Sequence, residues 1–233
     1  MSSKTYKLDQ IGLISVYKRR GAKRVNLRVS SKLVKVTQPL WLPYSTGLQF
    51  AIKNHQWIAE QRQRLPIFTI NDGMRVGKLH TIKVYESETL RTRVTNDKIK
   101  LYIPKNMDIN GDEVIERAKV TIKRALKSEA KNILGPRLLS IANQYGFTFK
   151  NSKFKSMKSR WGSCNSQKSI TLNIYLLLMP WELIDYVIIH ELTHTNHLHH
   201  GKSFWAAMGE TMPDYKNRRI KLKSIQQSIY NFQ

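Results

Sequence analysis

The chain has 233 residues, 41% of them hydrophobic, which suffices for the core of one compact unit or of two closely packed parts. Its 40 Lys and Arg outnumber 16 Asp and Glu, and the resulting net charge of +24 exceeds what solubility requires and attracts polyanions. One cysteine, Cys164, excludes a disulfide framework and a cysteine-rich zinc site, and without a membrane-spanning apolar run we expect a cytoplasmic protein, with association with the nucleoid as a further option.

Strand patterns dominate the first part of the chain, up to about residue 105. Apolar and polar residues alternate over 25–29 and 33–36, which predicts a hairpin closing near Ser30-Ser31. A helix is expected to begin near Ser45, to carry apolar side chains inward and to end at Pro66. The inward side chains of this helix are Phe50, Trp57 and Ile58. Three further apolar runs, at 81–85, 90–94 and 99–103, predict a meander of strands.

Helical patterns follow from about residue 106. Asn110-Gly111-Asp112 opens a long helix with a periodic apolar stripe, and Gly135-Pro136 predicts a break or kink in it. We therefore expect an α+β fold with an N-terminal β-rich subdomain over 1–105 and a C-terminal helical subdomain over 106–233, packed as one compact unit.

The segment His190-Glu191-Leu192-Thr193-His194 carries the strongest chemical signal. On a helix, residues four apart lie on one face, so His190 and His194 can reach a single metal ion. Glu191 lies next to the first imidazole, where its carboxylate can take a proton from a metal-bound water. Pro180 and the apolar spacing after it place this segment on a helix. The pattern is typical of a hydrolytic zinc site.

A catalytic zinc ion needs a third protein ligand and leaves one position for water. The candidates downstream are His197, His199, His200 and Glu210. If the helix ends near His199, a left-handed Gly201 would let the chain turn back and bring His200 to the metal. We favour His200, with His197 supporting the ligands or the transition state.

Several short motifs, separated along the chain, occur in an order that is typical of a known family. They are Arg160-Trp161-Gly162-Ser163-Cys164, Ile170-Thr171-Leu172-Asn173, Pro180, Asp185-Tyr186-Val187, the metal-binding segment, His200, Phe204-Trp205, Pro213-Asp214-Tyr215-Lys216 and Arg218-Arg219. Together they resemble the YgjP-like metallopeptidase family, which is related to the SprT-like zinc proteases. The resemblance implies a zincin-like fold whose C-terminal part carries the metal-binding helix. It also implies that His190, His194 and His200 bind Zn²⁺ and that Glu191 is the general base.

The resemblance further implies an edge strand that pairs with an extended peptide substrate. Ile170, Leu172 and Asn173 are the candidates, although an interior strand is equally compatible with their sequence, and Asn173 either orients substrate or caps the strand. A second electrophile beside the metal is expected from His197, Tyr215 or Arg218. Phe204 and Trp205 are expected to pack around the site.

Four lysines repeat every fourth residue on the long predicted helix: Lys119, Lys123, Lys127 and Lys131. Like charges at this spacing destabilise a helix by a few tenths of a kcal/mol per pair, approximately. Such a stripe suits phosphates, and we expect nucleic acid to be bound through its backbone without sequence reading.

The two signals predict a zinc-dependent metalloprotease that hydrolyses peptide bonds near nucleic acid. Two alternatives stay open: a nucleic-acid-binding protein with a structural or vestigial zinc site, and a zinc-dependent hydrolase of a non-peptide substrate. Glu191 argues against a purely structural site, because such a site has no use for a base.

Overall fold

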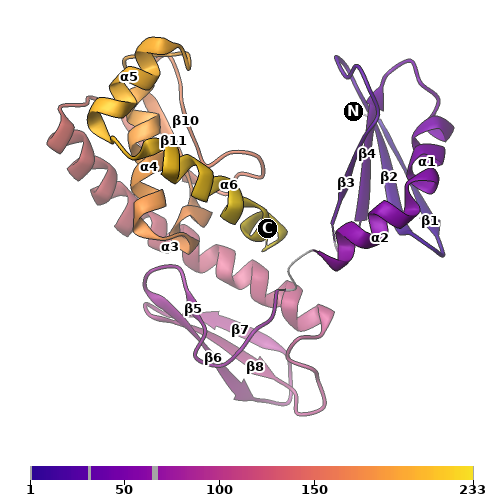
Figure 1. Cartoon of the computed structure of the whole chain (residues 1–233). Coiled ribbons are helices and arrows are strands. Elements are labelled where there is room, and N and C mark those ends of the chain that lie inside the picture. Colours follow the sequence, from indigo (N-terminus) through magenta and orange to yellow (C-terminus); the bar gives the residue numbers. More distant parts are fainter. Residues whose placement is uncertain (1, 31–32, 65–67, 233) are drawn as a thin grey trace. The chain divides into compact units, whose positions relative to one another are not determined.

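The computed structural model describes residues 2–30, 33–64 and 68–232, and the chain divides into two compact units, Met1–Ile67 and Phe68–Gln233 (Figure 1). The predicted α+β class is confirmed, with sheets in the N-terminal half and helices in the C-terminal half. The expected division after residue 105, within one compact unit, differs from this arrangement. The reason is that the strands between residues 75 and 103 share their core with the helices that follow.

The N-terminal unit is a four-stranded sheet with two helices. Its strands β1 (Ser3–Leu8), β2 (Gly12–Arg19), β3 (Asn26–Val29) and β4 (Leu33–Pro39) are ordered β1-β2-β4-β3. The antiparallel pair β3–β4, with Val29 opposite Val34, confirms the predicted hairpin, although Ser31 lies outside the described residues. Helices α1 (Tyr44–Lys53) and α2 (His55–Gln63) bury Ala51 and Ile58 against the sheet.

The single helix predicted here is in fact two helices. The chain is not helical at Asn54, with φ −101° and ψ 22°, which separates α1 from α2, and Pro66 lies outside the described residues. Of the three side chains expected to point inward, only Ile58 is buried. Phe50 and Trp57 are 37% and 43% exposed, because the change of direction at Asn54 breaks the helical period on which the prediction relied.

The second unit begins with a four-stranded sheet ordered β5-β6-β8-β7. Its strands are β5 (Arg75–Val76), β6 (His80–Glu86), β7 (Arg91–Val94) and β8 (Lys98–Ile103). The predicted meander is wrong: β6 is parallel to β8, and β7 pairs only with the far edge of β8. Buried side chains on the central strands, including Ile82 and Leu101, join the core formed with the long helix α3 (Asp112–Tyr145).

Glu129 of α3 links this sheet to the helix. Its buried carboxylate accepts hydrogen bonds from the backbone amides of Lys78 and Leu79 and contacts Nδ1 of His80 at 2.8 Å. Gly77 approaches the carboxylate so closely that an added Cβ would lie 2.5 Å from it, and its φ of +68° also favours glycine. The turn before β6 is therefore built around one buried acidic side chain.

Helix α3 continues through Gly135 and Pro136, so the predicted break is absent. A proline removes one intrahelical hydrogen bond, but the fully buried Leu134 and Leu138 hold the helix in the core on both sides of it. The helix ends where Gly146 adopts a left-handed conformation with φ +70°.

A three-stranded sheet and four further helical segments complete the unit. The sheet has the order β10-β11-β9 and contains β9 (Asn151–Lys155), β10 (Gly162–Cys164) and β11 (Ser169–Asn173). The helical segments are the 3₁₀ helix η1 (Ile174–Leu178), α4 (Trp181–Thr193), α5 (Lys202–Thr211) and α6 (Tyr215–Phe232). Helix α4 lies among β10, β11, α3, α5 and α6, which explains why most of its side chains are buried. Among the described helices, none combines the length and apolarity that crossing a bilayer requires.

Candidate metal centre

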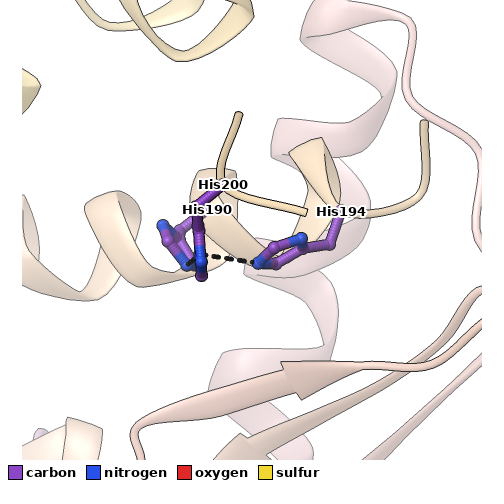
Figure 2. Close-up of side chains that lie close together, drawn as sticks. All are labelled: His190, His194 and His200. Atoms are coloured by element: carbon purple, nitrogen blue, oxygen red, sulfur yellow. Dashed lines mark hydrogen bonds between the residues drawn. The ribbon is translucent and has the colours of Figure 1, made fainter. Parts of the chain in front are cut away.

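Three imidazoles meet at the C-terminal end of α4. His190 lies in the last turn of the helix, His194 is its C-terminal cap, and His200 lies in the segment between α4 and α5. Nε2 of His200 is 3.0 Å from Nε2 of His190 and 3.0 Å from Nε2 of His194 (Figure 2). Figure 2 shows the three rings pointing toward one another, so the structure brings together the three histidines singled out from the sequence.

The chain reaches this arrangement by ending α4 early. The amides of Thr195, Asn196 and His197 bond to the carbonyls of Leu192 and Thr193, which forms a tight turn directly after the helix. The expected geometry of the turn, with a helix to His199 and a left-handed Gly201, is therefore wrong. Gly201 is extended, with φ −77° and ψ −175°, and precedes the first turn of α5. The return of His200 toward α4 depends on the early turn.

His197 acts on the site through its backbone. Its carbonyl oxygen lies 3.0 Å from Nδ1 of His194. Because a carbonyl can only accept, Nδ1 carries the hydrogen, and the lone pair of His194 is on Nε2, facing the other two imidazoles. This hydrogen bond orients His194 as metal-binding histidines are usually oriented. The atom of His197 that could support the site is therefore its backbone carbonyl oxygen.

Aromatic rings surround the three histidines. The ring of the fully buried Phe204 lies 4.6–5.0 Å, centroid to centroid, from all three imidazoles. Trp205 stacks on His200 at 5.6 Å, and Tyr215 stacks on Trp205 at 5.4 Å. The expectation that Phe204 and Trp205 pack around the site is confirmed. Tyr215 contacts the indole ring rather than the imidazoles.

The surroundings of His190 and His200 favour their uncharged forms near neutral pH. Burial, followed by the charges of His194, His200 and Arg219, lowers the pKa of His190 to about 3. Burial and the same kind of neighbours, His194 and Arg219, also lower the pKa of His200. A neutral imidazole is the form that binds metal.

The donor set fits a zinc ion. Three nitrogens bound tetrahedrally at 2.0–2.1 Å would be separated by about 3.3 Å. The two observed Nε2 separations of 3.0 Å are close to this value. A cation between the three imidazole nitrogens accounts for their convergence.

Glu191 lies beside the histidines and packs against strand β10. Its side chain is only 5% exposed, and an added Cβ on Gly162 would lie 2.5 Å from both its Cγ and its Oε1. Burial raises the pKa of Glu191 to about 8, an effect that the charge of Arg160 partly opposes. Within the described residues its Oε2 has no hydrogen-bond partner. A carboxylate that holds and releases a proton near neutral pH is suited to acid–base chemistry.

Positive charge reaches the site from a residue other than the one expected. Arg218 donates hydrogen bonds to Asp214 Oδ2 at 2.8 Å and to the carbonyl of Glu182 at 2.9 Å, so it ties α6 to the start of α4. Its neighbour Arg219 lies 4.8 Å from the centre of the Trp205 ring and lowers the pKa of His190 and His200. The signal was available in the sequence, because Arg219 is four residues after Tyr215 and so shares its face of a helix.

The residues predicted to form the substrate-binding edge lie on an interior strand. β11 is paired on one side with β10 and on the other with β9, and Ile170 and Leu172 are fully buried. Asn173 is buried too. Its amide donates to the carbonyls of Met157 and Arg160, and its Oδ1 accepts from the amide of Tyr175. Of the two roles considered for Asn173, the geometry shows the capping one.

Three of the four lysines of the stripe face solvent. Lys123, Lys127 and Lys131 are exposed on α3, whereas Lys119 is half-buried and pairs with Glu116 at 3.9 Å. This exposure is necessary for binding phosphates and does not by itself identify a partner.

The three convergent imidazoles, from α4 and the segment after it, lie beside a buried carboxylate of α4, an arrangement typical of metal-dependent hydrolases. The family model described as YgjP-like, metallopeptidase domain, matches residues 23–225, and the chain belongs to this family. The resemblance seen in the sequence is thereby confirmed, and the protein is a metallopeptidase-domain protein with a divalent metal site.

Two solved structures share limited similarity with the chain. The metallopeptidase zymogen abylysin of Pyrococcus abyssi is 21% identical, with a TM-score of 0.37, and the match covers 40% of this chain and 96% of that one. The metallopeptidase zymogen jannalysin of Methanocaldococcus jannaschii is 27% identical, with a TM-score of 0.33 and coverages of 39% and 91%. Among curated proteins, none matches the chain.

Proposed function

We propose that the protein is a zinc metallopeptidase in which His190, His194 and His200 hold the metal and Glu191 is the general base. The observation that carries the proposal is the convergence of the three imidazoles beside a buried carboxylate, with Nε2 of His200 3.0 Å from Nε2 of both His190 and His194. When bound in such a site, zinc lowers the pKa of a water molecule and polarises a carbonyl oxygen.

The chain's own groups complete the chemistry. Glu191 takes a proton from the attacking water and passes it to the leaving amine, for which its raised pKa is suited. The backbone carbonyl of His197 fixes the ring of His194, and Phe204 limits the movement of all three imidazoles. Arg219, rather than Arg218, supplies positive charge toward the developing oxyanion, because Arg218 is engaged by Asp214 and Glu182. Tyr215 supports this arrangement by stacking on Trp205.

The substrate strand is reassigned to β10. In the described part of the chain, β10 pairs only with β11 and is an edge of its sheet. Gly162 of this strand lies against Glu191, so a peptide added to the free edge would run past the base. Pairing through backbone amides and carbonyls would provide affinity with little sequence selectivity.

The charge of the chain supports activity near nucleic acid. A net charge of +24 attracts phosphates over long range, and the lysine stripe on α3 is exposed. Nucleic acid would then concentrate the enzyme on proteins bound to it. Localisation in the cytoplasm, including the nucleoid, agrees with this proposal.

The test is cleavage of a basic, unstructured protein by the zinc-loaded chain, with and without single-stranded or double-stranded DNA. We expect cleavage that a chelator abolishes, that zinc restores and that DNA stimulates. The same preparation carrying Glu191→Gln measures contaminating proteases. DNA binding without zinc-dependent cleavage would favour the nucleic-acid-binding alternative, and zinc-dependent hydrolysis of only a phosphodiester would favour the non-peptide hydrolase.

A further inference from the structure

The N-terminal unit concentrates positive charge. Between residues 1 and 67 there are 13 Lys and Arg, and the carboxylates in this range are Asp9 and Glu60. Asp9 lies in the turn between β1 and β2, and Glu60 lies on α2. Neither side chain belongs to a strand of the sheet. The sheet itself therefore carries cations without acidic neighbours.

The two faces of this sheet differ in what covers them. Ile14, Val16, Val34 and Val36 are fully buried on the face that packs against α1 and α2 (Figure 1). Side chains at the intervening positions point to the other face, because successive residues of a strand alternate. The hydrogen bond of 2.7 Å between Thr5 and Ser15 confirms that these two positions share that second face.

The second face, which we call the open face, carries cations from every strand of the sheet. These cations are Lys7, Arg19, Arg28 and Lys35, and all four are exposed. Arg28 lies directly opposite Lys35 in the register of β3 and β4. Like charges in this position destabilise a sheet. Such a pair makes physical sense when an anion lies between the two side chains.

Apolar and aromatic surface lies between these cations. Leu13 of β2 is 44% exposed and is in register with Leu33 of β4. The half-buried Tyr17 lies four residues further along β2, on the same face of the sheet. The ammonium group of Lys35 lies 4.3 Å from the centre of the Tyr17 ring. The open face thus combines groups that bind phosphate with groups on which a planar base can stack.

We propose that the open face binds single-stranded nucleic acid, with Arg28 and Lys35 on phosphates and Tyr17 under a base. A duplex presents phosphates but keeps the faces of its bases stacked inside, so it would leave Leu13, Leu33 and Tyr17 uncovered. A single strand presents both phosphates and base faces. The proposal rests on the nucleic-acid association proposed above, and assigns it to the N-terminal unit instead of the α3 stripe.

The experiment measures binding of fluorescein-labelled single-stranded DNA and RNA of about 20 nucleotides to the full-length zinc-loaded chain carrying Glu191→Gln, by fluorescence anisotropy over a range of salt concentrations. The face variant is Arg28→Gln with Lys35→Gln. Its matched control is Lys53→Gln with Arg64→Gln, which removes the same charge from exposed residues of the same unit outside the strands. A third variant, Lys123→Gln with Lys127→Gln, removes the same two positive charges from the lysine stripe on α3.

We expect the face variant to bind at least about tenfold more weakly at low salt and to lower the salt slope by about 1.4, which is the loss of two phosphate contacts on a single strand. Tyr17→Leu should weaken binding about fivefold or more through lost stacking without changing the slope. The control should change binding less than about twofold. The face variant should unfold at the same or a higher temperature, because it removes a like-charge pair, and loss of binding through misfolding would give a lower temperature.

Equal losses in the face variant and its control would overturn the assignment, as would tighter binding of the duplex or equally effective competition by polyglutamate. Loss of binding in the stripe variant alone would also overturn it, while leaving nucleic-acid association intact. No binding to any nucleic acid would refute both the assignment to the open face and the nucleic-acid association on which it rests. Peptidase activity is measured separately, on the chain that retains Glu191, so that failure of the binding proposal and failure of the peptidase proposal are distinguishable.

Discussion

At the scale of single residues, Gly162 decides where Glu191 can lie. A methyl group at residue 162 would come within 2.5 Å of the buried Glu191 side chain. We expect Gly162→Ala to cost about 1–3 kcal/mol of stability through overpacking and to lower peptidase activity at least about tenfold, because a displacement of about 1 Å can cost up to 100-fold. Zinc content should not change.

Gly135→Ala is the matched control for this substitution. Gly135 is in the interior of α3, and its added Cβ would lie at an ordinary 3.5 Å from Phe154. It should change stability by less than about 1 kcal/mol, because the gain in helix propensity is opposed by Pro136, whose ring disfavours a Cβ on the preceding helical residue. Full activity of the Gly162→Ala chain in a peptide-hydrolysis assay would contradict the close packing of Glu191 on β10.

His200 and His197 should respond differently to substitution. His200→Ala removes one of the three converging Nε2 atoms, and we expect zinc affinity to fall more than about 100-fold, beyond the 10–100-fold that loss of a supporting group costs. His197→Ala keeps the backbone carbonyl that orients His194, so zinc affinity should change little. Competition with a chromophoric chelator measures both, and the reverse order of effects would make His197 the ligand.

Much of the site could be predicted because it depends on local spacing. His190, Glu191 and His194 are fixed on one helical turn, and a turn after the helix made His200 the best third candidate. Local spacing places Arg219 on the same helical face as Tyr215, but it does not show that this face meets the site, and it gives no position for Gly162. Arg219 reaches the site from α6 and Gly162 from β10, and both contacts arise only when separate elements pack around α4.

At the scale of secondary-structure elements, Glu129 should hold the sheet of β5–β8 to α3. Glu129→Ala leaves the buried His80 and two backbone amides without their acceptor. We expect the unit of residues 68–233 to lose about 3–5 kcal/mol of unfolding free energy. The neighbouring exposed Ser128→Ala should change it by less than about 0.5 kcal/mol. The comparison is made by urea unfolding monitored by circular dichroism. Equal unfolding midpoints for the Glu129→Ala and Ser128→Ala chains would refute the role of Glu129.

Strand pairing was predicted less well than strand positions. The alternating residues identified β6, β7 and β8, but nothing local indicated that β6 pairs with β8 in parallel while β7 takes the outer edge. The sequence left an edge and an interior position for β11 equally open for the same reason, because its neighbours β9 and β10 are short and polar in sequence. Pairing is decided by packing over long sequence separations, which local periodicity does not record.

At the scale of the whole molecule, the two units divide the work proposed here. The unit of residues 68–233 contains the complete metal centre, including the base and the ring-packing residues. The unit of residues 1–67 contains a sheet with an open, cationic face. The strong positive charge of the chain is therefore concentrated most densely in the part that lacks the proposed catalytic residues.

The most direct test of the central claim is to measure zinc content and the initial rate of peptide hydrolysis on the same sample of the Glu191→Gln chain. We expect about one zinc ion per chain, as in the unaltered protein, because the three histidines are untouched. We also expect a loss of at least about 100-fold in rate, since the proposed general base is gone. A Glu191→Gln chain that holds zinc and cleaves peptides at the unaltered rate would contradict the assignment of this centre as a metallopeptidase site.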